Sequence, residues 1–208
     1  MGRHATSKGG GGGFRPEVGM HNVICCQIVD FGTHDKEWQG KIIGKVNKVN
    51  FGFEFVDITL ESDKGPYHPI WGAQFTNSLG KKSSLRPLLE GWRGKPFTKE
   101  EAEDFDLSKL LGLSCVLIIQ PNANNNPKIQ AIAKAPAPFE GKRELREFWV
   151  EEGCFDNDVP DWMPDWMKEE INSCYECTEG FDFDSKPEPS HGIELTEPPE
   201  EDFGEIPF

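Results

Sequence analysis

Apolar and β-branched residues alternate with polar ones through the first third of the chain, in the manner of β-strands. Residues 22–30 predict a first strand, followed by a polar loop over residues 31–41. Residues 41–60 predict a long second strand. Its apolar parity shifts at Phe55 and Val56, which indicates a bulge or a bend there. Residues 67–76 predict a third strand, and Pro69 places it at a sheet edge or at an irregular start.

A helical pattern follows these three segments. The spacing i, i+3, i+4, i+7 of an amphipathic helix is met by Leu85, Leu88, Leu89 and Trp92, and this helix should end near Gly94. A second short helix is predicted over residues 98–111, because Thr98 and Glu101 have the spacing of a capping box. Two helical segments therefore separate the third strand from the strands that come next.

Two more strands are predicted at residues 114–120 and 128–134, joined by a turn of Asn and Pro over residues 121–127. The order β-β-β-α-β-β predicts an all-β fold, an OB-fold-like five-stranded barrel with one or two short helices between strands 3 and 4. Other small β-barrels have compatible patterns. In an OB-fold, ligand binds on the face of strands 2 and 3, flanked here by the loops at 31–41 and 121–127.

Charge divides the 208-residue chain into unlike parts. Residues 1–136 hold 17 basic and 14 acidic side chains, whereas residues 137–208 hold 5 basic and 22 acidic ones, which together give the net charge of −14. The acidity is therefore confined to the C-terminal third, and the predicted barrel is slightly basic. A negative total does not exclude a polyanionic partner when the charge is distributed in this way.

Composition predicts four segments. Residues 1–19 are a flexible Gly-rich N-terminal tail, and residues 20–136 are the OB-fold-like domain. Residues 137–177 are an acidic extension that contains tryptophans and a short amphipathic piece over 162–171, and we expect this extension to pack against the barrel. Residues 178–208 are too polar to form a core and predict a disordered acidic tail.

Several classes of protein are excluded by what the sequence lacks. No run of about 18 apolar residues and no apolar leader segment is present, so we expect a soluble, cytoplasmic protein without a membrane partner. The six cysteines have no framework spacing and are expected to be reduced. Cys174 and Cys177 are at most half of a zinc site, so neither a metal nor another cofactor is predicted.

Enzymatic activity is not expected either. The segment 80–83 has the Gly-Lys-Lys-Ser order of a phosphate-binding loop, but Phe75 stands where that loop needs its first glycine. Most carboxylates lie in the acidic C-terminal region, where they cannot converge on a rigid metal site of the nuclease type. The sequence therefore favours a binding protein.

The last residues of the chain have the character of a docking peptide. An acidic run ends in an apolar tip with a free carboxylate, and the residues expected to bind a partner are Asp202, Phe203, Glu205, Ile206, Pro207 and Phe208. A terminal ring can fill an apolar pocket while a basic group pairs with the carboxylate. This ending resembles the acidic Ile-Pro-Phe tip of bacterial and phage single-stranded DNA-binding proteins, although Phe203 and Gly204 interrupt the acidic run.

The resemblance implies an OB-fold body that coats single-stranded DNA and a tip that recruits other proteins. Binding of single strands requires cations for the phosphates and flat rings for the bases. The candidates near the predicted groove are Lys36, Trp38, Lys41, Lys45, Lys48, Phe51, Phe53, Tyr67, Trp71, Lys81, Lys82 and Arg86. Phe51 and Phe53 could equally well be core residues as binding residues. Lys81, Lys82 and Arg86 could equally well belong to a solvated helix face.

The predicted function is thus that of a phage or bacterial single-stranded DNA-binding protein. It would protect single strands during DNA replication, recombination and repair, and its tip would recruit a polymerase, helicase, primase or nuclease. Two alternatives remain open: a strand-annealing recombination factor, and an adaptor that captures a host replication enzyme without binding DNA. A homo-oligomer is compatible with the sequence, as is location in a host cytoplasm.

Overall fold

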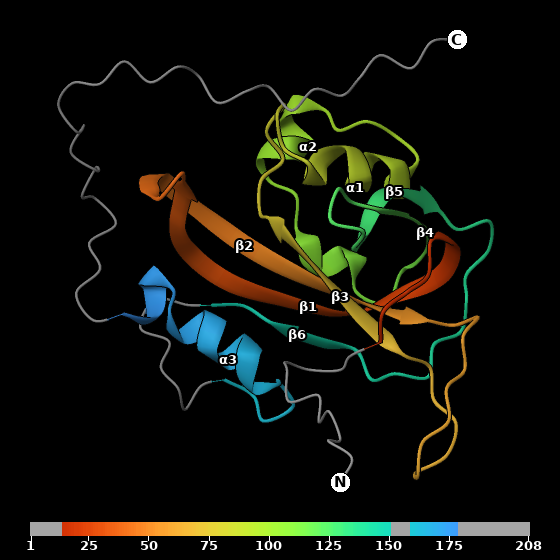
Figure 1. Ribbon diagram of the computed structural model, residues 1–208. Helices are drawn as coiled ribbons and strands as arrows, with labels where there is room; N and C mark the ends of the chain where they lie inside the picture. The colour runs from red at the N-terminus through yellow and green to blue at the C-terminus, as the bar shows by residue number, and fades with distance from the viewer. Residues whose placement is uncertain (1–13, 151–158, 179–208) are drawn as a thin grey trace, which may run out of the picture.

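Six strands and a few short helices make up the protein in a computed structural model, which describes residues 14–150 and 159–178 (Figure 1). The strands are β1 (Gly19–Trp38), β2 (Lys41–Phe55), β3 (Ile70–Thr76), β4 (Ser114–Pro121), β5 (Pro127–Lys134) and β6 (Arg146–Phe148). The helices are α1 (Leu85–Arg93), α2 (Lys99–Glu103) and α3 (Asp165–Asn172), with 3₁₀ turns η1 (Leu107–Leu110) and η3 (Tyr175–Cys177). The five longer strands are antiparallel in the order β3-β2-β1-β4-β5, and β6 runs parallel to β1. The protein is therefore mostly β, as predicted.

The first two strands form one long hairpin, so the predicted loop over 31–41 is wrong. Strand β1 continues to Trp38, and a two-residue turn at Gln39 and Gly40 leads into β2. Both turn residues have left-handed φ angles, 50° and 75°, which match the twist of a two-residue hairpin. Residues 33–38 and 41–47, called the arm below, extend beyond the rest of the sheet (Figure 1).

The main core lies between the inner face of the sheet and α1. It includes Phe51, Phe53 and Phe55 of β2, which have almost no exposed surface. Helix α1 adds the leucine stripe and Trp92, whose Nε1 donates to the Ser114 carbonyl at 3.2 Å. Gly91 faces β5, and a Cβ at this position would collide with the carbonyl oxygen of Ile132. Glycine therefore permits the close approach of α1 to β5.

The C-terminal extension forms a second core on the other face of β1. Val29 and Phe31 of β1 are buried there against four side chains of the extension: Val159, Met163, Met167 and Ile171. The main chain of the extension contributes β6, which the sequence pattern did not predict, and α3, which matches the predicted piece at 162–171. The extension therefore packs against the sheet, as expected.

Other element bounds agree with the sequence to different degrees. Strands β4 and β5 begin and end within one residue of the prediction. The predicted helix at 98–111 divides into α2 and η1, because the Asp106 side chain accepts hydrogen bonds from the backbone and hydroxyl of Ser108 and starts a new turn. Strand β2 ends at Phe55, where the parity shift lies, instead of at residue 60.

Candidate nucleic-acid interface

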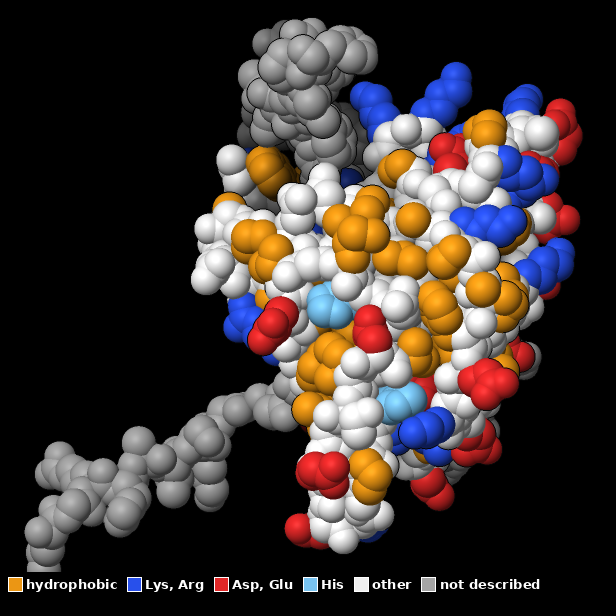
Figure 2. Space-filling view, turned by 90° about the vertical axis from the view of Figure 1, so that its right-hand side faces the viewer, with side chains coloured by type: hydrophobic (Ala, Val, Ile, Leu, Met, Phe, Trp, Pro, Cys, Tyr) orange, Lys and Arg blue, Asp and Glu red, His pale blue; other side chains and the backbone are white. Residues whose placement is uncertain are grey.

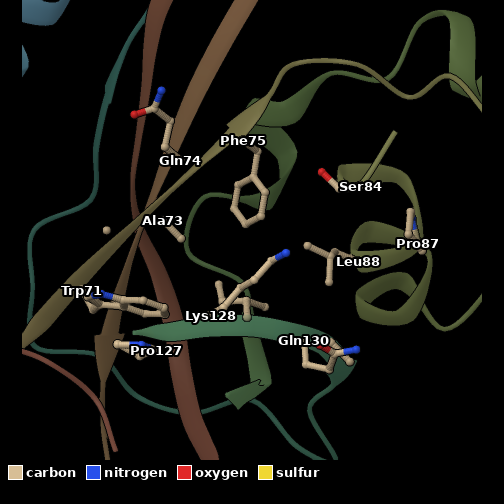
Figure 3. A pocket seen from close by; sticks show the side chains of 13 residues that line it. Trp71, Ala73, Gln74, Phe75, Ser84, Pro87, Leu88, Pro127, Lys128 and Gln130 are labelled. Carbon is tan, nitrogen blue, oxygen red and sulfur yellow. The ribbon is translucent and has the colours of Figure 1, made fainter. Parts of the chain in front are cut away.

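A pocket of about 530 Å³ lies between the two edge strands of the sheet and α1. Strand β3 lines it with residues 71–75, β5 with residues 127–131, and α1 with Pro87 and Leu88. Trp71 and Phe75 point from β3 into the cavity, and the Lys128 side chain extends over it from β5 (Figure 3). Its volume is within the usual range for pockets that bind small organic groups.

Strand β3 lies at an edge of the sheet, and some of its backbone amide and carbonyl groups have no partner on a neighbouring strand. The Phe55 amide donates to the Pro69 carbonyl and the Asn77 amide donates to the Asn47 carbonyl, so odd-numbered residues of β3 face β2. In an antiparallel pair, the intervening residues direct their amide and carbonyl groups outward. They are Ile70, Gly72, Gln74 and Thr76. Within the described residues no ladder joins β3 to β5, and the sheet is open at the pocket.

Three lysines lie at or near the pocket without an ion pair to any described residue. Lys128 lines it, and Lys81 and Lys82 are exposed in the loop that leads to Ser84, another lining residue. The side of the molecule that carries the ends of β4 and β5 shows hydrophobic side chains across its middle, with Lys and Arg along its upper and right-hand borders and Asp and Glu among them on the right (Figure 2). Apolar surface bordered by cations suits a ligand that has flat rings and anionic groups.

The arm carries a second group of predicted residues, at a distance from β5 (Figure 1). Lys36, Trp38 and Lys41 are exposed there, and Trp38 retains 46% of its accessible surface. Lys45 and Lys48 are engaged by the extension instead. The Lys45 amine lies 4.2 Å from the centroid of the Tyr175 ring, and Lys48 Nζ lies 2.7 Å from Glu170 Oε1.

Three predicted residues have structural roles that the sequence did not distinguish from binding. Phe51 and Phe53 are in the main core, so neither ring can stack on a base, and this part of the prediction is wrong. Arg86 donates to Glu90 on its own helix and to the carbonyl groups of Leu79 and Phe97. Its guanidinium therefore holds the loop that carries Lys81 and Lys82.

Tyr67 is half-buried, with the Arg143 guanidinium 5.5 Å from its ring centroid. Trp71 is thus the one predicted aromatic residue that lines the pocket. Lys128 and Phe75 also line the pocket and were not among the predicted site residues. The residue types of Lys128 and Phe75 do not indicate that they line a pocket, because this depends on which strand edges face the pocket in the folded protein.

Four of the described thiols, those of Cys25, Cys26, Cys115 and Cys174, are buried. Burial raises the pKa of Cys25 well above its ordinary value and raises the pKa of Cys26 to about 12. Burial also raises the pKa of Cys174. Among the residues that the structure describes, no three His, Cys, Asp or Glu side chains are placed to hold a metal ion. No helix in these same two ranges has the length and apolar character that crossing a membrane requires.

Comparison with known proteins adds no assignment: no protein family, no curated protein and no solved structure is detectably similar to this chain. The predicted docking tip, from Asp202 to Phe208, lies outside the described residues, as does the tail from residue 179. Inference about function therefore depends on the pocket between β3 and β5, on the arm, and on the sequence itself.

Proposed function

We propose that this protein binds single-stranded DNA in the groove between β3 and β5. The observation that carries the proposal is the placement of two aromatic rings, Trp71 and Phe75, in a pocket between open strand edges that Lys128 also lines. Lys81 and Lys82 lie in the loop that leads to the lining residue Ser84, and none of the three lysines has an ion pair with a described residue. Bases can stack on such rings only when they are not already paired and stacked in a duplex. Each such stack contributes roughly 1–3 kcal/mol with little dependence on sequence.

The strand order supports an OB-fold interpretation of the same residues. The OB-fold is a partly open five-stranded Greek-key barrel, and its ligands are oligonucleotides or oligosaccharides. Here the order β3-β2-β1-β4-β5 leaves β3 and β5 at the two open ends, and α1 lies between β3 and β4 in the chain. The two edge strands face one another across one pocket. A sheet that curls in this way has the arrangement of a partly open barrel.

The C-terminal tip gives the proposal its second component. The strand-binding body would coat and protect single strands during replication, recombination and repair. The tip, through Ile206, Pro207 and Phe208, would recruit a polymerase, helicase, primase or nuclease. The acidic residues before the tip suit a basic pocket on such a partner. The exposed arm residues Lys36, Trp38 and Lys41 remain candidates for a second contact with the strand.

Fluorescence anisotropy with labelled oligo(dT) tests the proposal directly. We expect tight binding at about 50 mM salt, weaker binding as salt rises because counterions are no longer released, and much weaker binding of a duplex of equal length. Quenching of tryptophan fluorescence should accompany binding. Absence of binding to single strands at low salt, or equal affinity for duplex, would contradict the proposal. An annealing assay with complementary strands separates coating from strand-annealing activity.

A further inference from the structure

The segment before β1 is fixed to the turn between β4 and β5. Phe14 packs edge-on against Phe55, with ring centroids 5.0 Å apart. The next residue, Arg15, donates from Nη2 to the Asn125 carbonyl at 2.8 Å and to Asn126 Oδ1 at 2.7 Å. More than 100 residues separate these partners in the chain. A residue that sequence reasoning assigns to a flexible tail is therefore held at a defined position.

The turn that holds Arg15 is itself well ordered by hydrogen bonds. Asn122 Oδ1 accepts from the amides of Asn124 and Asn126, and the Asn122 and Asn126 backbones are also joined. Asn125 adopts a left-handed φ of 58°, which asparagine tolerates better than most residues do. The two oxygens that accept from Arg15 thus belong to a rigid turn, and they orient the guanidinium.

The charge of Arg15 is not neutralised by this arrangement. Both acceptors are neutral oxygens, both hydrogen bonds come from the same nitrogen, and no carboxylate pairs with Arg15 among the residues that the structure describes. The side chain is exposed, so Nε and Nη1 can still donate to a ligand. A guanidinium presents its donors as a planar fork, which suits two oxygens of one phosphate.

The position of Arg15 connects it with the pocket. Its acceptors immediately precede Pro127 and Lys128, which line the pocket, and Pro127 lies beside Trp71 (Figure 3). We propose that Arg15 is a phosphodiester-binding residue at the Trp71 end of the groove, held in place by the Asn-rich turn. This inference rests on the proposed function. It adds a contact with the sugar-phosphate backbone of the DNA to a site described above by its aromatic rings and lysines.

Salt dependence of oligo(dT) binding gives a quantitative test. For single strands, each phosphate contact contributes about 0.7 to the slope of log affinity against log salt. Arg15→Gln should therefore lower the slope by about 0.7, which corresponds to about eightfold weaker binding near 50 mM salt and about threefold near 200 mM. Arg15→Lys keeps the charge and should keep the wild-type slope. Lys64→Gln removes one charge from the exposed loop between β2 and β3 and is the matched control.

The outcomes separate this inference from the proposed function. If wild-type protein binds and Arg15→Gln retains the wild-type slope, Arg15 contacts no phosphate and the inference is wrong, while the function stands. If Arg15→Gln weakens binding equally at every salt concentration, Arg15 only orders the turn and the inference is again wrong. If the wild-type protein does not bind single strands, the function fails and the inference falls with it. A scan with single methylphosphonate linkages should show one position to which wild type is sensitive and Arg15→Gln is not.

Discussion

Replacement of Trp71 by alanine is the most direct test of the groove. The ring lines the pocket from β3, and Phe75 is the other ring on the same strand that does so. Because Phe51 and Phe53 of β2 are buried in the core, neither of these two rings can substitute for Trp71 there. Loss of one base stack should cost about 1–3 kcal/mol of binding free energy, which is about 5- to 150-fold in the dissociation constant for oligo(dT).

Anisotropy titrations at one fixed salt concentration measure this effect. Trp71 is partly buried against the main core, so thermal unfolding must first show that the variant is folded at the assay temperature. Trp71→Phe keeps a ring and should lose less than about fivefold. Trp166→Ala, which removes a half-exposed indole from α3, is the matched control and should bind like wild type. Wild-type affinity in folded Trp71→Ala would refute the placement of bases in this pocket.

Three further predictions concern the fold itself. Gly91→Ala should lower the stability by about 1–3 kcal/mol in urea unfolding because its Cβ meets β5, whereas Gly80→Ala, in an open loop, should change little. Glu54→Ala should lower it by about 3–5 kcal/mol, because the buried carboxylate accepts from His68 Nδ1 and from two backbone amides of the extension; a loss below 1 kcal/mol would contradict this. Alkylation at pH 8, mapped by mass spectrometry, should spare Cys26, whose raised pKa of about 12 keeps it protonated, until the protein is denatured.

Elements with strong local signals could be predicted from the sequence. Strands β4 and β5 are short apolar runs on either side of an Asn-rich turn, and their bounds were predicted closely. The capping box of Thr98 and Glu101 is present, with both of its hydrogen bonds. The leucine stripe of α1 is buried as its spacing indicated. In each case the information lies within a few residues, so a local pattern is sufficient.

The arm could not be predicted, because its order depends on residues about 140 positions away. Thr33 and Asp35 read as polar loop residues, yet the Thr33 amide and hydroxyl donate to Glu176, and the Tyr175 hydroxyl donates to Asp35. These contacts cap the free edge of β1 and allow a polar strand to persist. No periodicity within residues 31–41 contains that information.

Contacts between the extension and the arm also explain why the candidate site in the structure differs from the site predicted from the sequence. The sequence placed the ligand on strands 2 and 3 beside the first loop, with Lys45 and Lys48 among its cations. In the folded protein the extension occupies that side, and Tyr175 and Glu170 engage both lysines. Lys81, Lys82 and Lys128 near the pocket have no such partner among the described residues.

Removal of the extension would not simply restore the predicted surface. Val29 and Phe31 have almost no exposed area because the second core covers them, and Gly32 has no room for a Cβ because Cys174 and Glu176 lie against it. Release of the extension would therefore expose large apolar side chains of β1 to water, at a free-energy cost of roughly 1.5–3 kcal/mol for each. The extension is thus a part of the fold and not a readily detached cover. No described residue of the extension is among those that line the pocket between β3 and β5, so the proposed binding groove is not covered by the extension in the folded protein.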